Sequence, residues 1–206
     1  MMLRGDPQAL LLRVIAILVA VTVHEFAHAW TADRLGDPTP RTRGRLSLNP
    51  IVHLDPIGSL LLLLAGFGWA KPVEVNPMYF PDPRRGMLVV AAAGPLANVA
   101  TALLLGLAYQ FGLVEPGTLL GSLLLTAIII NAVLAIFNLL PVPPLDGSKI
   151  ISGLLPASQA RSYDRLAQFG PLLLLALILL PGRLIGLLLD LPVRWLVGLA
   201  IGAGGL

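Results

Sequence analysis

The sequence predicts an all-α polytopic membrane protein, and three observations support this prediction. Hydrophobic residues make up 56% of the 206 residues and charged residues only 12%, too little charge to cover the surface of a soluble domain. The mean hydropathy is +0.85. Several apolar stretches also approach or exceed the about 20 residues that a helix needs to cross a bilayer. We expect one integral-membrane domain over 1–206, a bundle of about four to six transmembrane or re-entrant helices.

The predicted helices follow the apolar stretches of the sequence. The stretches that we interpret as spans or as a terminal hairpin are 9–32, 86–112, 118–140, 169–180 and 184–204. Residues 57–70 are apolar but too few for a straight span, so we predict a re-entrant or buried segment there. Valines and charged residues alternate between prolines over 71–77, which predicts a small extended β element.

The distribution of charge predicts how the protein lies in the membrane. The first apolar stretch lacks a small-residue cleavage site, so we predict a retained helix rather than a removed signal. Basic residues gather on one side of the predicted spans, and they include Arg34, Arg41, Arg43, Arg45, Lys71, Arg84, Arg85, Lys149, Arg161 and Arg165. The turn at 113–117 on the other side has no Lys or Arg. By the positive-inside rule, we expect a multi-pass cell-membrane protein with its N-terminus outside and its basic side in the cytoplasm.

His24, Glu25 and His28 form the sequence HEFAH near the end of the first predicted span. Two imidazoles four residues apart project from one face of a helix and can share a tetrahedral metal ion. Glu25 lies on the flank, where a general base takes a proton from water. Two histidines packed in a bundle are the alternative, but these groups cost several kcal/mol inside a membrane unless they pair or bind metal. The motif therefore predicts a hydrolytic metal site.

The third metal ligand must come from a histidine or a carboxylate, because the sequence contains no cysteine. His53 is the one remaining histidine. Asp146 follows three prolines within four residues at the end of an apolar helix, and unwound backbone at membrane depth must line a cavity or be buried by protein. Asp146 is therefore a candidate ligand, with an ordinary helix-end aspartate as the alternative. Asp146 and HEFAH are expected at similar depth, near the cytoplasmic face.

The order of several motifs resembles the site-2 protease family of intramembrane zinc metalloproteases. The motifs are HEFAH, GPLAN at 94–98, NLLPVPPLDG at 138–147, and the stretches GRLSLNPIVHLDPIGS and FGWAKPVEVNP. They cover most of the chain from about residue 10 to 170. The resemblance is to the short bacterial and archaeal members, which lack a PDZ or CBS domain.

The resemblance implies a role for each residue of these motifs. The ligands of one Zn²⁺ per chain would be His24, His28 and Asp146. Glu25 would activate the attacking water, and Asn138 would hold the substrate or the developing oxyanion. His53 would assist at the active site, with an ordinary loop role as the alternative. We interpret Asn98 first as a helix-packing residue and second as a contributor to the site.

The resemblance also implies the reaction, namely hydrolysis of peptide bonds in or near transmembrane segments of membrane proteins. Because a transmembrane helix hides its peptide groups in hydrogen bonds, the substrate must unwind, and the extended segment 73–76 is expected to receive it by edge pairing. The rival interpretations are a membrane metal-ion transporter and a non-catalytic scaffold, and a transport site needs no base such as Glu25. We expect a transmembrane substrate and the lipid bilayer as partners, and no nucleic acid. The substrate's identity and the oligomeric state are not predicted.

Overall fold

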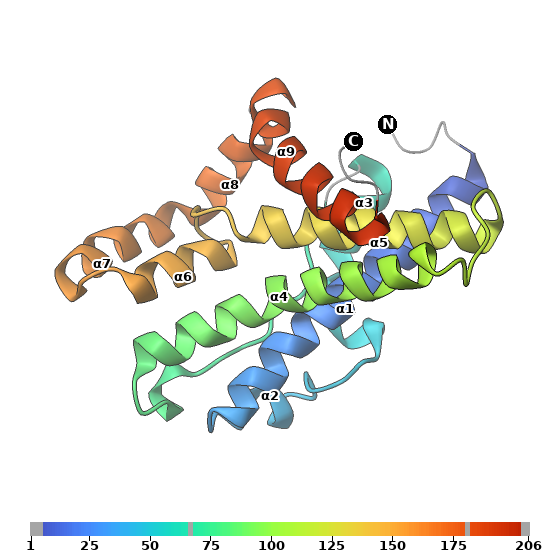
Figure 1. The fold of residues 1–206 in the computed structure, drawn as a ribbon. Helices are drawn as coiled ribbons and strands as arrows, with labels where there is room; N and C mark the ends of the chain where they lie inside the picture. Colours follow the sequence, from blue (N-terminus) through green and yellow to red (C-terminus); the bar gives the residue numbers. More distant parts are fainter. Residues whose placement is uncertain (1–5, 66–67, 180–181, 203–206) are drawn as a thin grey trace.

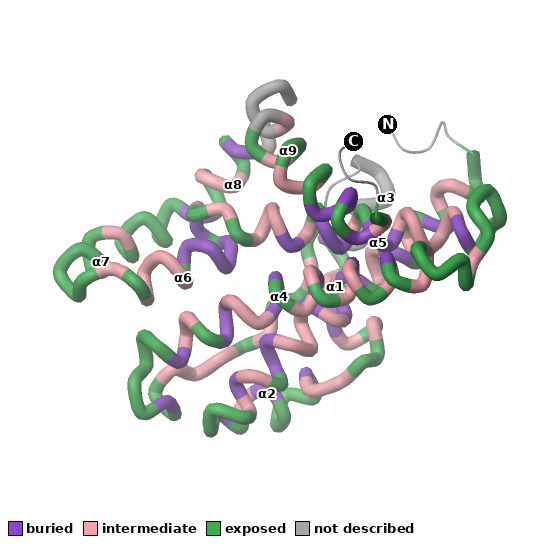
Figure 2. The backbone as a smooth tube through the Cα atoms, in the orientation of Figure 1, coloured by how far each residue is buried: buried purple, intermediate pink, exposed green. Residues whose placement is uncertain are grey.

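Three long helices form the centre of the fold, which a computed structural model describes for residues 6–65, 68–179 and 182–202 (Figure 1). They are α1 (Pro7–Arg34), α4 (Pro83–Gln110) and α5 (Leu119–Asn138). Within the described residues, these three are the helices long and apolar enough to cross a membrane. They pack on one another, and their buried residues lie where they meet (Figure 2). The predicted all-α polytopic fold is confirmed, and the ends of these helices differ from the predicted ones by at most three residues.

The ends of the long helices follow from the local sequence. Asp6 precedes α1, and its carboxylate accepts the N–H of Gln8 at 3.0 Å. Pro7 then occupies the first turn, where its missing N–H costs nothing. α4 begins in the same way after Asp82. Gly36, with φ of 106°, follows the end of α1 in the left-handed region that glycine adopts readily.

A close contact fixes helix α9 (Gly182–Ile201) on the pair formed by α4 and α5. The buried apolar cluster between these helices consists of Ala102, Ile128, Ala132, Leu196, Val197 and Ala200. A Cβ atom added to Gly106 would lie 2.6 Å from the carbonyl carbon of Ala200. The Gln110 side-chain amide donates to the carbonyl oxygen of Ala200 at 2.6 Å. In a bilayer, close packing and interhelical hydrogen bonds of this kind drive helix association.

The C-terminal hairpin consists of α8 (Gly170–Leu179) and α9, and its predicted ends at Leu180 and Gly204 lie outside the described residues. Before it the structure contains α6 (Asp146–Leu154), α7 (Ala157–Asp164) and the 3-10 helix η4 (Arg165–Phe169), which the sequence analysis did not predict. Arg84 of α4 donates to the carbonyls of Ser152 and Leu155 at 2.8 and 2.5 Å. The C-terminal end of α6 is thereby held against the first turn of α4.

The segment between α1 and α4 folds back beside α1. Its short helical elements are α2 (Thr39–Thr42), η2 (Pro50–His53), α3 (Pro56–Ala65) and η3 (Pro77–Tyr79). Helix α3 matches the short apolar segment predicted over 57–70 but ends before Gly66, after which two residues lie outside the described part. The predicted β element at 71–77 is non-helical over 71–76. Among the described residues it forms no sheet, and a single antiparallel bridge joins Leu54 to Ala70 just before it.

Substitution of Gly106 by alanine tests whether the contact with Ala200 holds α9 in place. The added methyl group has no space against the backbone of α9, and overpacking of this kind costs about 1–3 kcal/mol. We expect a lower midpoint of thermal unfolding in detergent. Gly186→Ala is the matched control, because its Cβ would meet nothing within 4 Å; an equal loss in both variants would contradict the interpretation.

Candidate metal centre

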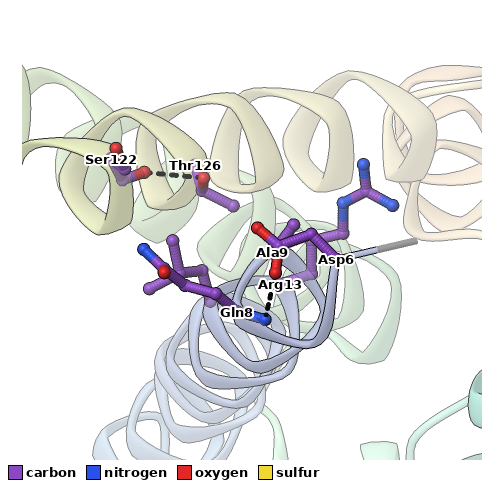
Figure 3. Close-up of a pocket in the computed structure, with 7 residues that line it drawn as sticks. Asp6, Gln8, Ala9, Arg13, Ser122 and Thr126 are labelled. Carbon is purple, nitrogen blue, oxygen red and sulfur yellow. Dashed lines mark hydrogen bonds between the residues drawn. The ribbon is translucent and has the colours of Figure 1, made fainter. Parts of the chain in front are cut away.

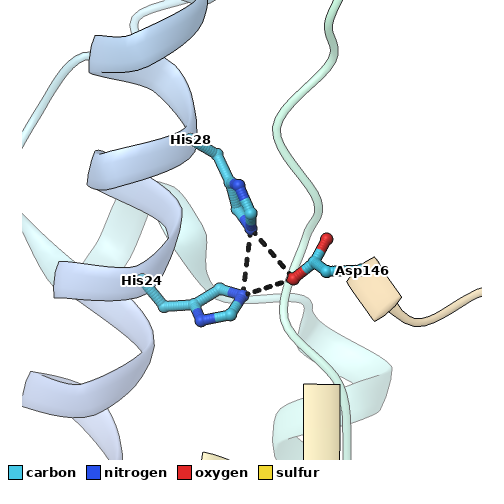
Figure 4. A group of neighbouring side chains, drawn as sticks. All are labelled: His24, His28 and Asp146. Carbon is cyan, nitrogen blue, oxygen red and sulfur yellow. Dashed lines mark hydrogen bonds and ion pairs between the residues drawn. The ribbon is translucent and has the colours of Figure 1, made fainter. Parts of the chain in front are cut away.

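Three side chains from distant parts of the sequence converge where α1 faces the start of α6 (Figure 4). They are His24 and His28 of α1 and Asp146 of α6, and we call them the triad. The Nε2 atoms of the two histidines lie 3.0 Å apart. Asp146 Oδ2 lies 3.1 Å from Nε2 of His24 and 3.2 Å from Nε2 of His28. All three residues are buried, with at most 7% of each residue exposed.

The chain after α5 brings the carboxylate of Asp146 to the histidines. Helix α5 ends at Asn138, a proline-rich turn follows, and α6 begins at Asp146 itself. Gly147 then lies directly on the last turn of α5, since a Cβ there would come within 2.5 Å of the carbonyl carbon of Leu139. Only a residue without a side chain fits at this close approach. The DG pair therefore joins the end of α5 to the triad.

The outer nitrogen of each imidazole is hydrogen bonded, which fixes the tautomer of each ring. Nδ1 of His28 lies 2.7 Å from the carbonyl oxygen of Val90, which can only accept. Nδ1 of His24 lies 2.6 Å from Oδ1 of Asn98. Both Nδ1 atoms therefore donate a proton, and both Nε2 atoms present a lone pair to the space beside Asp146.

The donor set of the triad fits a zinc ion. Two imidazole lone pairs and a carboxylate oxygen face one another, and three acceptors at about 3 Å repel unless a cation lies among them. Tetrahedral zinc with bonds of about 2.0–2.1 Å places its ligand atoms about 3.3 Å apart, close to the observed 3.0 to 3.2 Å. Three protein ligands leave a fourth position open, as in catalytic zinc sites.

Gly94 of α4 lies directly against both imidazoles. A Cβ at this position would come within 2.6 Å of Cε1 of His28 and 2.7 Å of Cε1 of His24. The absence of a side chain here lets α4 approach the histidines closely enough for Val90 and Asn98, on either side of Gly94, to bond them. Gly94 therefore belongs to the wall of the site.

The second carboxylate oxygen of Asp146 faces a cation. Lys149, one turn further along α6, lies 3.9 Å from Oδ1. With Lys149 beside Oδ1, the other oxygen, Oδ2, faces the two imidazoles, and this arrangement suits Asp146 to bind a metal cation.

Glu25 lies beside the triad and contacts the segment between α3 and α4. Its Oε2 atom accepts the backbone N–H of Val73 at 3.1 Å. Three residues further on, the N–H of Asn76 donates to Asp37 at 2.7 Å. The non-helical segment 71–76 is therefore held along α1, with one end directly at Glu25.

The hydrogen bonds of His53 and Asn138 go to groups other than the triad. His53 is completely buried, and its Nε2 lies 2.8 Å from the carbonyl oxygen of Ser47. Its carbonyl accepts the N–H of Lys71 at 2.9 Å, so the residue joins its loop to the start of the extended segment. The Asn138 amide donates to Leu134 of its own helix at 3.0 Å. A catalytic role for His53 or Asn138 stays a prediction.

Two asparagines lie behind His24, and the sequence analysis assigned neither of them to the metal. Asn98 was interpreted first as a packing residue and second as a contributor to the site, and the structure places it in contact with His24. Asn131 of α5 was missed; its Oδ1 accepts from Nδ2 of Asn98 at 2.8 Å, and it is completely buried. An asparagine in the middle of an apolar helix signals a buried partner, but the sequence does not say which one.

A separate polar hollow lies near the opposite end of α1 (Figure 3). It has a volume of about 280 Å³, and its lining includes Asp6 and Arg13 of α1 and Ser122 and Thr126 of α5. Arg13 is eleven residues from His24, roughly 16 Å along a helix. This hollow is therefore distinct from the site at the triad.

The fold and the site define a helical membrane protein with a buried cluster of two histidines and an aspartate. The family model described as Peptidase family M50 matches residues 112–181, which include Asp146. YwhC of Bacillus subtilis, provisionally named a zinc metalloprotease, is 42% identical over 175 residues, covering 82% of this chain and 80% of the relative. The chain belongs to the site-2 protease family, peptidase family M50.

Other relatives carry similar names. Rip2 of Mycolicibacterium smegmatis, also provisionally named a zinc metalloprotease, is 33% identical over 178 residues, covering 80% of this chain and 65% of the relative. The zinc metalloprotease MJ0392 of Methanocaldococcus jannaschii is 27% identical over 141 residues, covering 68% of this chain and 33% of the relative. The chain thus spans about two thirds or less of these longer proteins. No solved structure matches it significantly.

Substitution of Gly94 by alanine tests the close approach of α4 to the histidines. The methyl group would displace both imidazoles, and we expect zinc affinity, measured by chelator competition on purified protein, to fall about 10- to 100-fold. Gly186→Ala is the control, because its Cβ would meet nothing within 4 Å. Unchanged zinc affinity in Gly94→Ala would show that the triad is not where zinc binds.

Proposed function

We propose that this protein is an intramembrane zinc metalloprotease that hydrolyses peptide bonds in or near transmembrane segments of membrane proteins. The observation that carries the proposal is the triad, in which three acceptor atoms meet in a buried site beside Glu25. His24, His28 and Asp146 would hold one Zn²⁺ per chain. The zinc metalloprotease names of the relatives support this assignment.

The residues beside the metal supply proton transfer and orientation. Zinc, when bound, polarises the scissile carbonyl and makes water more acidic. Glu25 takes the proton of the attacking water and gives it to the leaving amine as the peptide bond breaks. The Val73 N–H bond holds one oxygen of Glu25 in place. Burial of the triad keeps bulk water from the reacting groups.

The extended segment next to Glu25 supports a binding mode for the unwound substrate. A strand that pairs with an edge needs free backbone groups. The N–H groups of Val73 and Asn76 are already bonded to Glu25 and Asp37. Those of Glu74 and Val75 have no hydrogen-bond partner among the described residues. Neighbouring residues of an extended segment point their backbone groups to opposite sides, so one strand can pair with only one of the two. We expect the substrate strand to pair at Glu74, the residue after the one that bonds Glu25.

The orientation of the protein in the membrane, that is, which end of its long helices faces the cytoplasm, is also a proposal. The end of α1, the start of α4 and helix α6 lie at one end of the molecule, whereas the start of α1 and the turn between α4 and α5 lie at the other (Figure 1). The first end contains Arg34, Arg84, Arg85 and Lys149. By the positive-inside rule this end faces the cytoplasm, and the triad is closer to it.

Substitution of Glu25 by glutamine tests whether Glu25 is the general base of the reaction. The amide keeps the size of the side chain but cannot accept the water proton, so we expect peptide hydrolysis to fall about 10²- to 10⁴-fold with zinc still bound. Quantitative comparison of membranes from cells with parent and variant protein identifies candidate substrates as proteins that accumulate, and purified candidates are then cleaved in vitro. Glu115→Gln, in the turn between α4 and α5, is the matched control and should cleave normally.

Two results would contradict the protease proposal. Cleavage at the parent rate by Glu25→Gln would exclude Glu25 as the base. Zinc flux into liposomes that persists in the variant, with no substrate cleaved by the parent protein, would favour a metal-ion transporter. The transporter interpretation does not require Glu25, whereas the protease interpretation does.

Substitution of Glu74 by proline tests edge pairing. Proline removes the N–H that would bond the substrate strand and keeps the backbone extended. We expect KM for a membrane substrate to rise and bound zinc to be unchanged. Glu74→Ala is the control, because it loses the same exposed ion pair with Arg43 but keeps the N–H. Equal KM values for the two variants would contradict pairing at this residue.

A further inference from the structure

A chain of hydrogen bonds from α5 through α4 to α1 ends at the metal-ligand candidate His24. Nδ2 of Asn131 donates to the carbonyl of Ala127 at 2.8 Å. Oδ1 of Asn131 accepts from Nδ2 of Asn98 at 2.8 Å. Oδ1 of Asn98 faces Nδ1 of His24 at 2.6 Å. We call Asn131 and Asn98 the amide pair.

Backbone carbonyls determine which group donates and which accepts in each of these hydrogen bonds. The Ala127 carbonyl can only accept, so Asn131 must turn its NH₂ group toward it and its oxygen toward Asn98. Asn98 then meets two acceptors, the oxygen of Asn131 and the carbonyl of Ala20 at 2.9 Å. Its NH₂ group must face both of them, and its oxygen must face His24. His24 is therefore protonated at Nδ1 and free to bind metal at Nε2.

The amide pair is completely buried, and a buried amide without hydrogen-bond partners is costly among membrane helices. The two histidines also differ in how they are held. His28 bonds the Val90 carbonyl of the neighbouring helix directly, whereas His24 relies on the side chain of Asn98, which the Ala20 carbonyl and Asn131 orient together.

We propose that Asn131 is a positioning residue of the metal centre, which acts through Asn98 to fix the tautomer and the ring orientation of His24. The inference rests on the proposed zinc site. Helix α5 then has two connections to that site. One runs from Asn131 through Asn98 to His24, and the other runs through the turn after α5 to Asp146. Loss of groups that orient a ligating histidine weakens metal binding about 10- to 100-fold.

The test compares variants of the purified full-length protein for zinc affinity, by chelator competition, and for the visible spectrum of the Co²⁺-substituted form. Asn131→Leu keeps the approximate volume and removes both hydrogen bonds. We expect it to bind zinc about 10- to 100-fold more weakly and to shift the Co²⁺ bands. Asn131→Asp, protonated when buried, keeps a donor toward Ala127 and an acceptor toward Asn98, and should bind zinc more tightly than Asn131→Leu.

Thr126→Val on the same helix is the matched control. It removes one partly buried side-chain hydrogen bond, from Thr126 to the Ser122 carbonyl at 2.7 Å, and should leave zinc affinity and the Co²⁺ spectrum unchanged. The double variant of Asn98→Leu and Asn131→Leu should bind zinc no more weakly than Asn98→Leu alone, because both residues act through one bond to His24.

The possible failures are distinguishable. Parent-like zinc affinity and Co²⁺ spectrum in Asn131→Leu, or additive losses in the double variant, would overturn the positioning role and leave the zinc site intact. A lower thermal stability of Asn131→Leu without a change in the Co²⁺ spectrum would likewise show that Asn131 serves only helix packing. Parent-like zinc affinity in His24→Ala would overturn the zinc site itself, and the positioning role with it.

Discussion

The burial of two imidazoles and a carboxylate among apolar helices is the constraint on which the rest of the structure depends. Polar groups inside a membrane must be satisfied by protein. Each polar atom of the two imidazole rings accordingly faces a defined neighbour. To provide these neighbours, α4 must approach α1 closely, and Gly94 makes this approach possible. The packing of the helices and the geometry of the site therefore have the same cause.

The parts of the structure that the sequence predicted are those that depend on local patterns. The three long helices follow from apolar length, whereas the Asp–Pro pairs at which α1 and α4 begin played no part in that prediction. HEFAH places its two histidines on one face because a helix repeats every 3.6 residues. The third member, Asp146, lies 118 residues beyond His28. Spacing alone left its role open, and the resemblance to a family was needed to assign it.

The parts that the sequence did not predict depend on contacts between distant segments. Asn131 lies in an apolar helix, and its sequence neighbourhood does not reveal that Asn98 is its partner. The alternation at 73–75 predicted a small extended β element, and the backbone there is non-helical but forms no strand among the described residues. It could not show that Val73 bonds Glu25 or that the described segment has no strand partner. Helices α6 and α7 are short and mixed in composition, so neither apolar length nor periodicity identified them.

The fixed ends of α6 limit how the length of the chain can vary. Asp146 begins this helix at the triad, and Arg84 of α4 bonds the carbonyls of Ser152 and Leu155 at its other end. The nine residues of α6 correspond to roughly 13 Å at the usual rise. One inserted residue would turn the ends by about 100° relative to each other, so that either Asp146 or the contact with Arg84 would be lost. Insertions and deletions should therefore be excluded from α6.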